Sequence, residues 1–477
     1  MTATHPVLVI GAGPVGLAAA AHLLARGLEP LILEAGAGVA ANVADWGHVR
    51  TFSPWRYNID KAARALLERA GWQAPDPEAL PTGREIVERY LRPLAALPEI
   101  ARHLRLRHRV TAVSRSHVDK VKTTGREASP FLVRADTPEG EVEFLAGAVL
   151  DASGTWATPN PLGANGLPAL GEARFADRIR YGIPDVLGLE RARYAGRTTL
   201  VVGSGHSAAN ALLDLARLAA EAPGTRLVWA VRGADPRRAF GGGDADMLQA
   251  RGALGSALRR LQESGALDLV TGFRVARLEA DGGRLAVVGT DGRRIEGVDA
   301  VVAATGQRPD LTPTRELRLR LDPWLECADA LGPLIDPNLH SCGTVRPHGV
   351  RELSHPEPGF WTVGVKSYGR APTFLMATGY EQVRSVAAFL AGDLAAAHDV
   401  QLDLPETGVC NSNPGPKPAD AAAGGCCGGP APAGVEACCA KDADAKAAGD
   451  EGCGCGEPVP APVTVVAAPA GGCCARA

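Results

Sequence analysis

A glycine-rich segment near the N-terminus constrains this chain more than any other feature. Gly11, Gly13 and Gly16 have the Gly-x-Gly-x-x-Gly spacing, directly after the apolar run 7–10 and before the Ala- and Leu-rich run 15–26. The first glycine permits a tight turn, the second lets a phosphate approach the backbone, and the third lets a helix pack on a strand. The segment therefore predicts a strand, a turn and a helix whose N-terminus binds the pyrophosphate of a dinucleotide.

A second strand and an acidic residue complete this unit. Gly27 is expected to end the helix, and the apolar residues 30–33 are predicted to form the next strand. Glu34 follows directly, where an acid accepts hydrogen bonds from the adenosine ribose. The N-terminal region is therefore expected to have an α/β fold with a parallel sheet.

A second unit of the same kind begins near residue 199. Apolar residues 200–202 lead into Gly203, Gly205 and Ser207, and a helix is predicted to continue to about residue 220. Ala208 stands in place of the third glycine, which the motif tolerates. The chain therefore repeats one fold unit.

Arginines follow the second strand of this repeated unit, where the first unit has an acid. Arg232 comes directly after the predicted strand 227–231, and Arg237 and Arg238 are close behind. A guanidinium at this place suits the 2′-phosphate of NADPH and disfavours NADH. The alternative is a solvated basic loop with no ligand.

Apolar patterns predict the remaining elements. Helices are expected at residues 59–70, 82–97 and 373–391. Strands are expected at residues 106–114, 131–135, 148–150, 267–270, 274–279, 285–289 and 300–304. The residues from 104 to 150 are interpreted as a small antiparallel sheet.

Two predicted strands end in small residues, at Ala152-Ser153-Gly154 and Ala304-Thr305-Gly306. Small residues at a strand end let a cofactor approach the backbone. With these motifs, residues 6–392 resemble the flavoproteins with two dinucleotide-binding domains, a family that includes flavin-containing monooxygenases and thioredoxin-reductase-like enzymes.

The resemblance implies an α/β fold in which an FAD-binding Rossmann-type domain is interrupted by an inserted NAD(P)H-binding Rossmann-type domain. FAD and NADPH are the cofactors it implies. The expected boundaries are 1–160 and 311–400 for the two parts of the FAD domain, 161–310 for the NADPH domain, and 401–477 for a disordered Cys-rich tail.

The resemblance also implies several cofactor contacts. The backbone of Val110 is expected to contact the flavin adenine. Gly154 and Gly306 are expected to lie against the cofactors, and Gly364 and Lys366 are expected at the pyrimidine edge of the flavin.

The monooxygenase branch is the more similar one, on residues 152–161 followed by Gly166-Leu167-Pro168. The globular part has no Cys-x-x-Cys for a dithiol relay. Two features depart from the branch: its Phe-x-Gly and His fingerprint is not intact near 175–178, and His206 replaces a common Asn. Both features control the reaction with oxygen in that family.

Aromatic and cationic residues crowd the segment 46–57, where this family packs the isoalloxazine ring. His48 and Arg50 are candidates to hold a charged flavin or substrate, and His206 and Lys366 complete the catalytic candidates. The alternative for the segment is a set of core aromatics with a surface arginine.

Nine of the eleven cysteines lie after residue 400. Eight of them are candidate ligands for a soft metal or a trivalent arsenical: Cys426, Cys427, Cys438, Cys439, Cys453, Cys455, Cys473 and Cys474. Their spacing is not that of a structural zinc site. The whole chain resembles monooxygenase-like flavoproteins found with arsenic-resistance genes, although an incidental low-complexity tail is the alternative.

The formal net charge of −3 gives no reason to expect nucleic acid or an anionic membrane as partner. No apolar run has the length of about 18 to 20 residues that crosses a bilayer, so we expect a cytoplasmic protein. The leading prediction is an NADPH-dependent flavin monooxygenase that oxygenates a small soft nucleophile. The alternatives are a flavin reductase acting on a thiol, metalloid or quinone, and sequestration of a soft metal by the tail. The oligomeric state is left open.

Overall fold

The computed structural model describes residues 5–246, 248–339, 348–372, 374–401 and 446. The chain divides into a compact unit, residues 1–413, and a second unit, residues 414–477. Almost all of the second unit lies outside the described residues, and with it the predicted disorder of the tail and its eight candidate metal ligands.

A parallel sheet forms around the first glycine-rich segment. The predicted strand, helix and strand are present as β1 (Val7–Ile10), α1 (Pro14–Ala25) and β2 (Pro30–Leu33). All four residues of β1 are buried, because parallel sheets of this kind are covered on both faces. The strand order is β16-β7-β1-β2-β3. The other strands are β3 (Leu104–Arg105), β7 (Ala148–Asp151) and β16 (Phe360–Thr362).

A second parallel sheet repeats this arrangement, with the strand order β11-β10-β9-β15-β8. Its central strand β9 lies between β10 and β15, as β1 lies between β2 and β7. Helix α9 (His206–Glu221) follows β9 as α1 follows β1. The strands are β8 (Ile179–Tyr181), β9 (Thr198–Val202), β10 (Arg226–Ala230), β11 (Asp268–Val270) and β15 (Ala300–Ala303).

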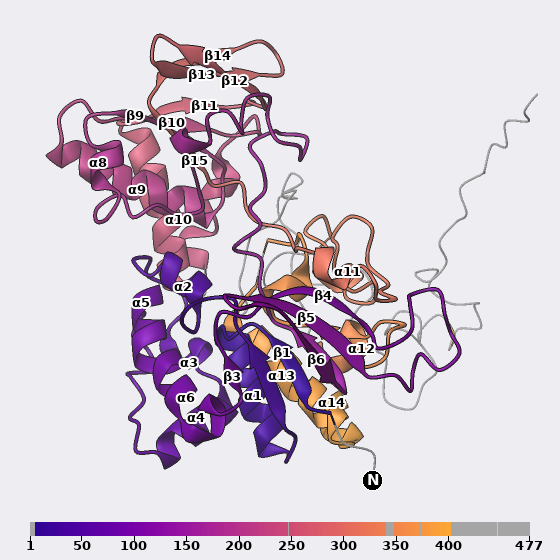
Figure 1. The fold of residues 1–477 in the computed structure, drawn as a ribbon. Helices are drawn as coiled ribbons and strands as arrows, with labels where there is room; N and C mark the ends of the chain where they lie inside the picture. Colours follow the sequence, from indigo (N-terminus) through magenta and orange to yellow (C-terminus); the bar gives the residue numbers. More distant parts are fainter. Residues whose placement is uncertain (1–4, 247, 340–347, 373, 402–445, 447–477) are drawn as a thin grey trace, which may run out of the picture. The chain divides into compact units, whose positions relative to one another are not determined.

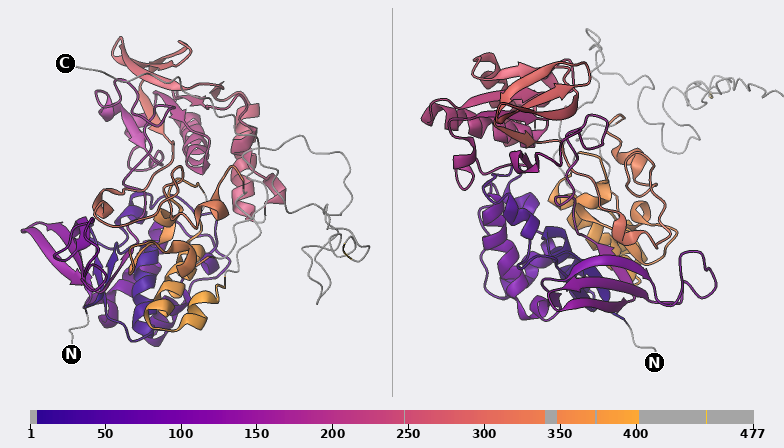
Figure 2. Two further views of the ribbon diagram at one scale, coloured as in Figure 1. Left: turned by 90° about the vertical axis from the view of Figure 1, so that its right-hand side faces the viewer. Right: turned by 45° about the horizontal axis from the view of Figure 1, so that its top comes forward.

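Each parallel sheet is accompanied by a three-stranded antiparallel sheet, which Figure 2 shows from two sides. The first is formed by β4 (Arg109–Arg115), β5 (Phe131–Thr137) and β6 (Gly140–Ala146). The second is formed by β12 (Val275–Asp281), β13 (Arg284–Gly289) and β14 (Arg294–Val298).

The predicted antiparallel region differs from the observed one in three respects. The predicted strand 106–114 is present as β4 (Arg109–Arg115), which begins three residues later because Arg107 adopts a left-handed φ of 58°. The predicted strand 148–150 is part of the parallel sheet, where it pairs with β1. Strand β6, with its polar and exposed positions, was not predicted, because only its last residue is buried.

The predicted helices are present with altered limits. The pattern at 59–70 forms α4 (Lys61–Arg69), and the pattern at 373–391 forms α13 (Met376–Leu390). The pattern at 82–97 forms α5 (Gly83–Ile86), a π turn (Val87–Leu91) and α6 (Arg92–Ala96). The shorter helices are α2 (Ala41–Asp45), α3 (Trp55–Asn58), α7 (Pro98–Ala101), α8 (Arg191–Tyr194), α11 (Gly332–Ile335), α12 (Val350–Leu353) and α14 (Leu394–His398).

Helix α10 (Gln249–Glu263) was not predicted, because glycines interrupt its sequence. A Cβ added at Gly252 would lie 2.1 Å from the Gly243 carbonyl oxygen, and one at Gly255 would lie 2.0 Å from that of Phe240. The glycines therefore serve close packing of the helix on the preceding loop, which overrides their low helix propensity.

The main core joins the start and the end of the compact unit. Helices α1 and α13, far apart in the sequence, lie in the same region of Figure 1 and contribute to one hydrophobic cluster. Ala18 and Ala21 of α1 and Val383 of α13 are fully buried in it. The small α1 side chains allow close helix packing, so strand β16 and helix α13 complete the sheet and core that β1 and α1 begin.

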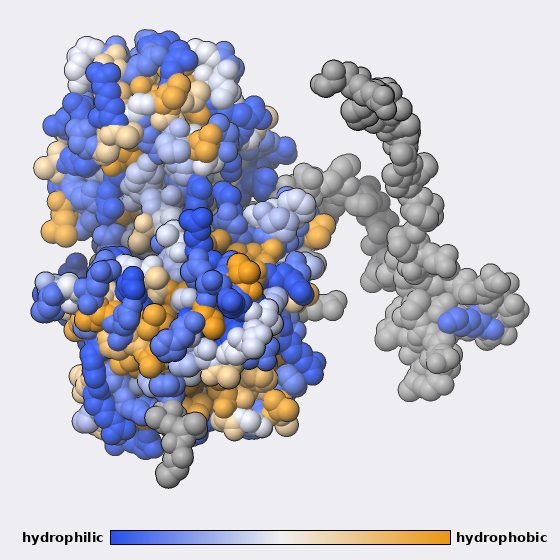
Figure 3. Space-filling view, turned by 45° about the vertical axis from the view of Figure 1, so that its right-hand side comes forward, coloured by the Kyte–Doolittle hydropathy of each residue, from blue (hydrophilic) through white to orange (hydrophobic). Residues whose placement is uncertain are grey.

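Among the described residues, none of the helices has the length and apolarity that a membrane span requires. On the face drawn in Figure 3, apolar residues are scattered among hydrophilic ones. Single exposed apolar residues are normal on a folded surface.

Candidate functional site

The three glycines of the first loop have three different environments. A Cβ at Gly11, where φ is 97°, would lie 2.9 Å from the Ala152 carbonyl oxygen. A Cβ at Gly16 would lie 1.9 Å from the Gly11 carbonyl oxygen. A Cβ at Gly13 would meet nothing within 4 Å. Gly11 and Gly16 are thus needed for packing, whereas the backbone at Gly13 is open to a ligand, as a pyrophosphate site requires.

The second loop reproduces this geometry. A Cβ at Gly203, where φ is 138°, would lie 2.2 Å from the Ala304 carbonyl oxygen, and one at Gly205 would meet nothing within 4 Å. Gly205 and His206 are exposed at the N-terminus of α9, and Ser207 is half-buried beside them. The Ala304 carbonyl therefore packs against Gly203 as the Ala152 carbonyl packs against Gly11. Both loops fit a dinucleotide phosphate.

Glu34 is held against the first loop. Its carboxylate accepts hydrogen bonds from the backbone N–H of Ala12 and of Gly36, each at 2.7 Å, and the residue is 8% exposed. Each carboxylate oxygen has a further lone pair, so a ribose hydroxyl can still donate to it. This position fits the predicted role of Glu34.

The chain that leads into Val110 passes beside Glu34. The backbone N–H of His108 donates to the Glu34 carbonyl oxygen at 2.8 Å, and that of Arg107 donates to Gly36 at 3.0 Å. Val110 follows in β4. Its predicted contact with the flavin adenine is therefore compatible with the position of Glu34, the residue predicted to bind the ribose.

Glycines with left-handed backbones line the carboxyl ends of both parallel sheets. Gly154 and Gly306 have φ angles of 75° and 84°, at matching positions after β7 and β15. Gly364 has a φ of 71°, and a Cβ there would lie 3.3 Å from the Val15 side chain. The Gly364 N–H donates to Gln382 Oε1 at 2.8 Å, so α13 holds this loop against α1.

Lys366 forms a buried ion pair. Its Nζ lies 2.7 Å from Asp151 Oδ2 and 3.0 Å from Ser153 Oγ, and both charged residues are at most 3% exposed. Ser153 Oγ also donates to Asp151 Oδ1 at 2.6 Å. Because its amine is engaged in this way, Lys366 is better placed to position the Ser153-Gly154 turn than to react with a substrate.

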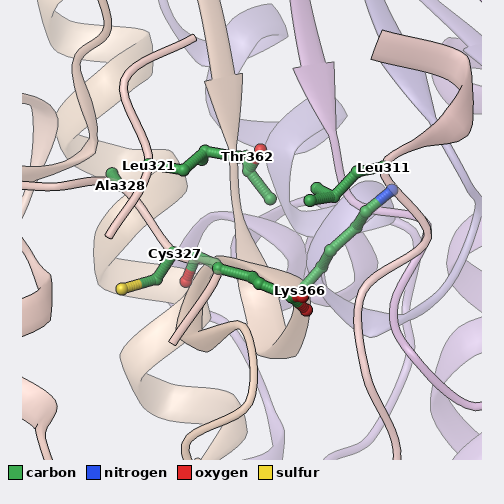
Figure 4. Close-up of a pocket in the computed structure, with 8 residues that line it drawn as sticks. Leu311, Leu321, Cys327, Ala328, Thr362 and Lys366 are labelled. Carbon is green, nitrogen blue, oxygen red and sulfur yellow. The ribbon is translucent and has the colours of Figure 1, made fainter. Parts of the chain in front are cut away.

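A small cavity adjoins Lys366. Its volume is about 10 Å³, room for about one water molecule. The lining residues are Leu311, Leu321, Glu326, Cys327, Ala328, Thr362, Lys366 and Ser367. Figure 4 shows that the Lys366 amine and the Cys327 thiol point away from each other. The two groups therefore do not form a catalytic pair.

Cys327 is the free cysteine that the structure describes, and it is buried. Burial, reinforced by the Asp322 carboxylate, raises the pKa of its thiol to about 12. A thiol in this state is a poor nucleophile near neutral pH. Cys327 is thus unsuited to thiol–disulfide exchange.

The two catalytic candidates of the aromatic segment lie in different surroundings. His48 is half-buried, and its Nε2 has no hydrogen-bond partner among the described residues. Arg50 is exposed and donates to the Leu80 carbonyl oxygen. Trp55 is fully buried in the main core, so the segment combines core aromatics with a surface arginine.

His206 contacts an aromatic residue of the same segment. The ring centroids of Phe52 and His206 are 5.1 Å apart, and the guanidinium of Arg251 lies 6.0 Å from the Phe52 ring. Partial desolvation and then the Arg251 cation lower the pKa of His206, although more than a third of the residue stays exposed. The imidazole is therefore neutral near pH 7.

The three arginines after β10 differ in their surroundings. All three are exposed, and Arg237 also pairs with Asp235. They follow the strand next to the second loop, which is where the adenosine ribose lies in such units.

The candidate tail ligands cannot be placed, since they lie outside the described residues. Within the part of the chain that the structure describes, no group of three or more His, Cys, Asp or Glu side chains is arranged to hold a metal ion.

The model of the pyridine nucleotide-disulphide oxidoreductase family matches residues 8–327. This chain belongs to that family. It is accordingly a flavin-dependent oxidoreductase with FAD as cofactor. A search of curated proteins finds no significant match.

Solved structures of several activities share the fold. A bacillithiol disulfide reductase from Bacillus cereus is 18% identical, with a TM-score of 0.59, and the match covers 82% of this chain and 99% of that one. An FAD-bound cadaverine monooxygenase from Erwinia amylovora is 16% identical, with a TM-score of 0.55 and coverage of 88% and 100%. A flavin-containing monooxygenase from Stenotrophomonas maltophilia is 20% identical, with a TM-score of 0.51 and coverage of 82% and 98%. They confirm the predicted fold class.

Several residues of the site were not predicted from the sequence. Asp151 and Ser153 bind Lys366, Gln382 holds Gly364, and Phe52 contacts His206. Asp151 could have been singled out from the sequence, because an acidic residue at the end of an apolar strand is unusual. The contacts of Gln382 and Phe52 join segments that are far apart in the sequence, so no local sequence pattern predicts them.

Proposed function

We propose that this protein is an NADPH-dependent flavin monooxygenase that oxygenates a small soft nucleophile. The observation that carries the proposal is the pair of loops with matching geometry, each with an open second glycine. The Gly11 loop and Glu34 hold FAD, and the Gly203 loop holds the pyridine nucleotide. When bound, the flavin would supply the redox chemistry: it would accept a hydride from the nicotinamide and, once reduced, would react with oxygen.

The choice of NADPH rests on the basic loop after β10. Arg232 and Arg238 are exposed there, and a guanidinium binds a 2′-phosphate with bidentate, charge-assisted hydrogen bonds. Arg237 is already paired with Asp235. We therefore assign the 2′-phosphate to Arg232 and Arg238 first.

The choice of oxygen as acceptor rests on the resemblance of residues 152–161 to the monooxygenase branch. A relay of electrons from the flavin to a disulfide by thiol–disulfide exchange requires a reactive protein thiolate. Cys327 is buried with a raised pKa, so it does not serve this purpose. The second candidate, a flavin reductase that passes electrons to a thiol, metalloid or quinone, is favoured by the fold shared with the bacillithiol disulfide reductase.

Rapid mixing with NADPH tests the proposal. Under anaerobic conditions, NADPH is expected to bleach the flavin at least about tenfold faster than NADH at equal subsaturating concentration, because about 1.4 kcal/mol of binding gives this factor. When oxygen and a small soft nucleophile are then added, the flavin is expected to be reoxidised, with one oxygen atom transferred to the nucleophile, the other released as water, and one product formed per NADPH consumed. Full NADPH turnover without oxygen, once a disulfide, metalloid or quinone is added, would instead establish the reductase.

We further propose that the tail binds a soft metal or a trivalent arsenical. Four closely spaced cysteine pairs, 426–427, 438–439, 453–455 and 473–474, provide the thiolates such ions prefer. A chain ending at Asn413 retains the compact unit. It is expected to reduce FAD at the full-length rate and to lose most of the arsenite or zinc bound by the full chain, as measured by equilibrium dialysis. Equal binding by both chains would contradict this proposal.

A further inference from the structure

We propose that Phe52, a residue of the flavin-binding part, forms with His206 a subsite for the nicotinamide ring of the pyridine nucleotide. This inference rests on the proposed function, because it adds a binding contact to the proposed NADPH site. It assigns to Phe52 the positioning of the nicotinamide half of the dinucleotide.

The first step concerns direction along the second loop. The pyrophosphate is expected at Gly205, where the backbone is open, and at the N-terminus of the 16-residue helix α9. Arg232 lies at the end of the neighbouring strand β10, on the adenosine side. The nicotinamide half must therefore leave Gly205 away from Arg232, toward the flavin-binding part of the chain.

The second step concerns what that part presents to the loop. Phe52 is half-buried and lies directly against His206, the first residue of α9, with 5.1 Å between ring centroids. His206 is itself exposed and follows Gly205 in the chain. Thus an aromatic ring from outside the nucleotide-binding sheet adjoins the open phosphate site.

The third step is that this contact is held in place. Asp45, a few residues before Phe52, accepts a hydrogen bond from Trp156 Nε1 at 2.7 Å and lies 3.5 Å from Arg180 of β8. On the other side, Arg251 near the Phe52 ring is fixed by a two-point ion pair with Asp246, at 2.6 and 2.8 Å. The segment before Phe52 and the guanidinium beside its ring are therefore each fixed by polar contacts.

The chemistry of the subsite suits a reduced nicotinamide. The ring of Phe52 offers an apolar aromatic surface, and the neutral His206 imidazole adds no charge to it. Aromatic rings stack at such surfaces in offset or tilted geometry. The subsite thus recognises the planar, uncharged dihydronicotinamide, whereas the adenosine half is recognised elsewhere.

The test compares two ligands on one variant. In Phe52→Ala, NADPH is expected to bind about five- to tenfold more weakly, as loss of one stacking contact predicts. The fragment 2′,5′-ADP, which carries the adenosine half and no nicotinamide, is expected to inhibit as well as it inhibits the wild type. Phe52→Tyr keeps the ring and is expected to restore most of the NADPH affinity.

Tyr57→Ala is the matched control, since it removes a half-buried ring from the same segment that stacks with Arg56. It should leave both affinities unchanged. Equal loss of NADPH and 2′,5′-ADP in Phe52→Ala, or no loss of either, would overturn the inference while leaving NADPH as the donor. If wild-type flavin is not reduced by NADPH, the proposed function itself fails, and the subsite with it.

Discussion

Alanine at Gly13 is expected to weaken FAD binding by about ten- to hundredfold while leaving the apoprotein folded. The added methyl group meets no protein atom within 4 Å, and in the proposed FAD site it would take up the space of the cofactor phosphate. Overfilling a packed contact by one methyl group costs about 1–3 kcal/mol, which corresponds to that range of affinity. Since Gly13 is also the N-cap of α1, the apoprotein should lose at most about 1 kcal/mol.

Alanine at Gly16 is expected to act mainly on the stability of the apoprotein, and on FAD binding only as a consequence. Its Cβ would lie 1.9 Å from the Gly11 carbonyl oxygen, a backbone atom that can move only with the loop. The apoprotein should therefore be destabilised by about 3 kcal/mol or more, and FAD binding should fall as a consequence of the displaced loop.

The two variants are separated by measuring FAD affinity and apoprotein unfolding on the same preparations. Gly38→Ala is the control, because Gly38 is exposed and its Cβ would also meet nothing within 4 Å. If Gly13→Ala bound FAD as tightly as Gly38→Ala does, the loop would not be the phosphate site.

Methionine at Lys366 is expected to destabilise the protein by about 3–5 kcal/mol. The substitution keeps most of the side-chain volume but leaves the Asp151 carboxylate, 2% exposed, without its cationic partner. Removing one member of a buried ion pair has this cost because the remaining charge stays desolvated. The Ser153-Gly154 turn loses a contact at the same time, so FAD affinity should also fall.

The measurement is urea unfolding of the apoprotein and of the FAD-loaded protein. The double variant Lys366→Met, Asp151→Asn should recover part of the loss, since no unpaired charge remains. Lys61→Met, at an exposed lysine of α4, is the control and should change the free energy of unfolding by about 0.5 kcal/mol or less. A comparably small effect in Lys366→Met would show that the ion pair does not support the fold.

The elements next to the glycine-rich loops were predicted well because their signals are local. Residues 7–10 and 30–33 form β1 and β2 with the predicted limits, and both loops have the expected positive φ at the first glycine. Elements without a local signal were missed. Strand β16 has three residues, and α10 contains glycines that are explained only by the loop packed on it.

The candidate catalytic residues show where local patterns are insufficient. The sequence placed His48 and Arg50 in an aromatic segment but could not distinguish a core from a cofactor surface. In the structure, Arg50 bonds a neighbouring loop, and it is Phe52 that reaches the second dinucleotide loop. The assignment of these residues to catalysis stays a prediction.

The sequence by itself determined that this chain has two dinucleotide-binding loops, because glycine spacing and flanking apolar runs act within about thirty residues. Only the tertiary structure decided which residues pack against each loop. The Ala152 and Ala304 carbonyls, the Lys366–Asp151 ion pair and the Phe52–His206 contact join segments far apart in the sequence. Such contacts depend on how strands and helices pack, and packing complementarity between distant segments leaves no periodic trace in either one.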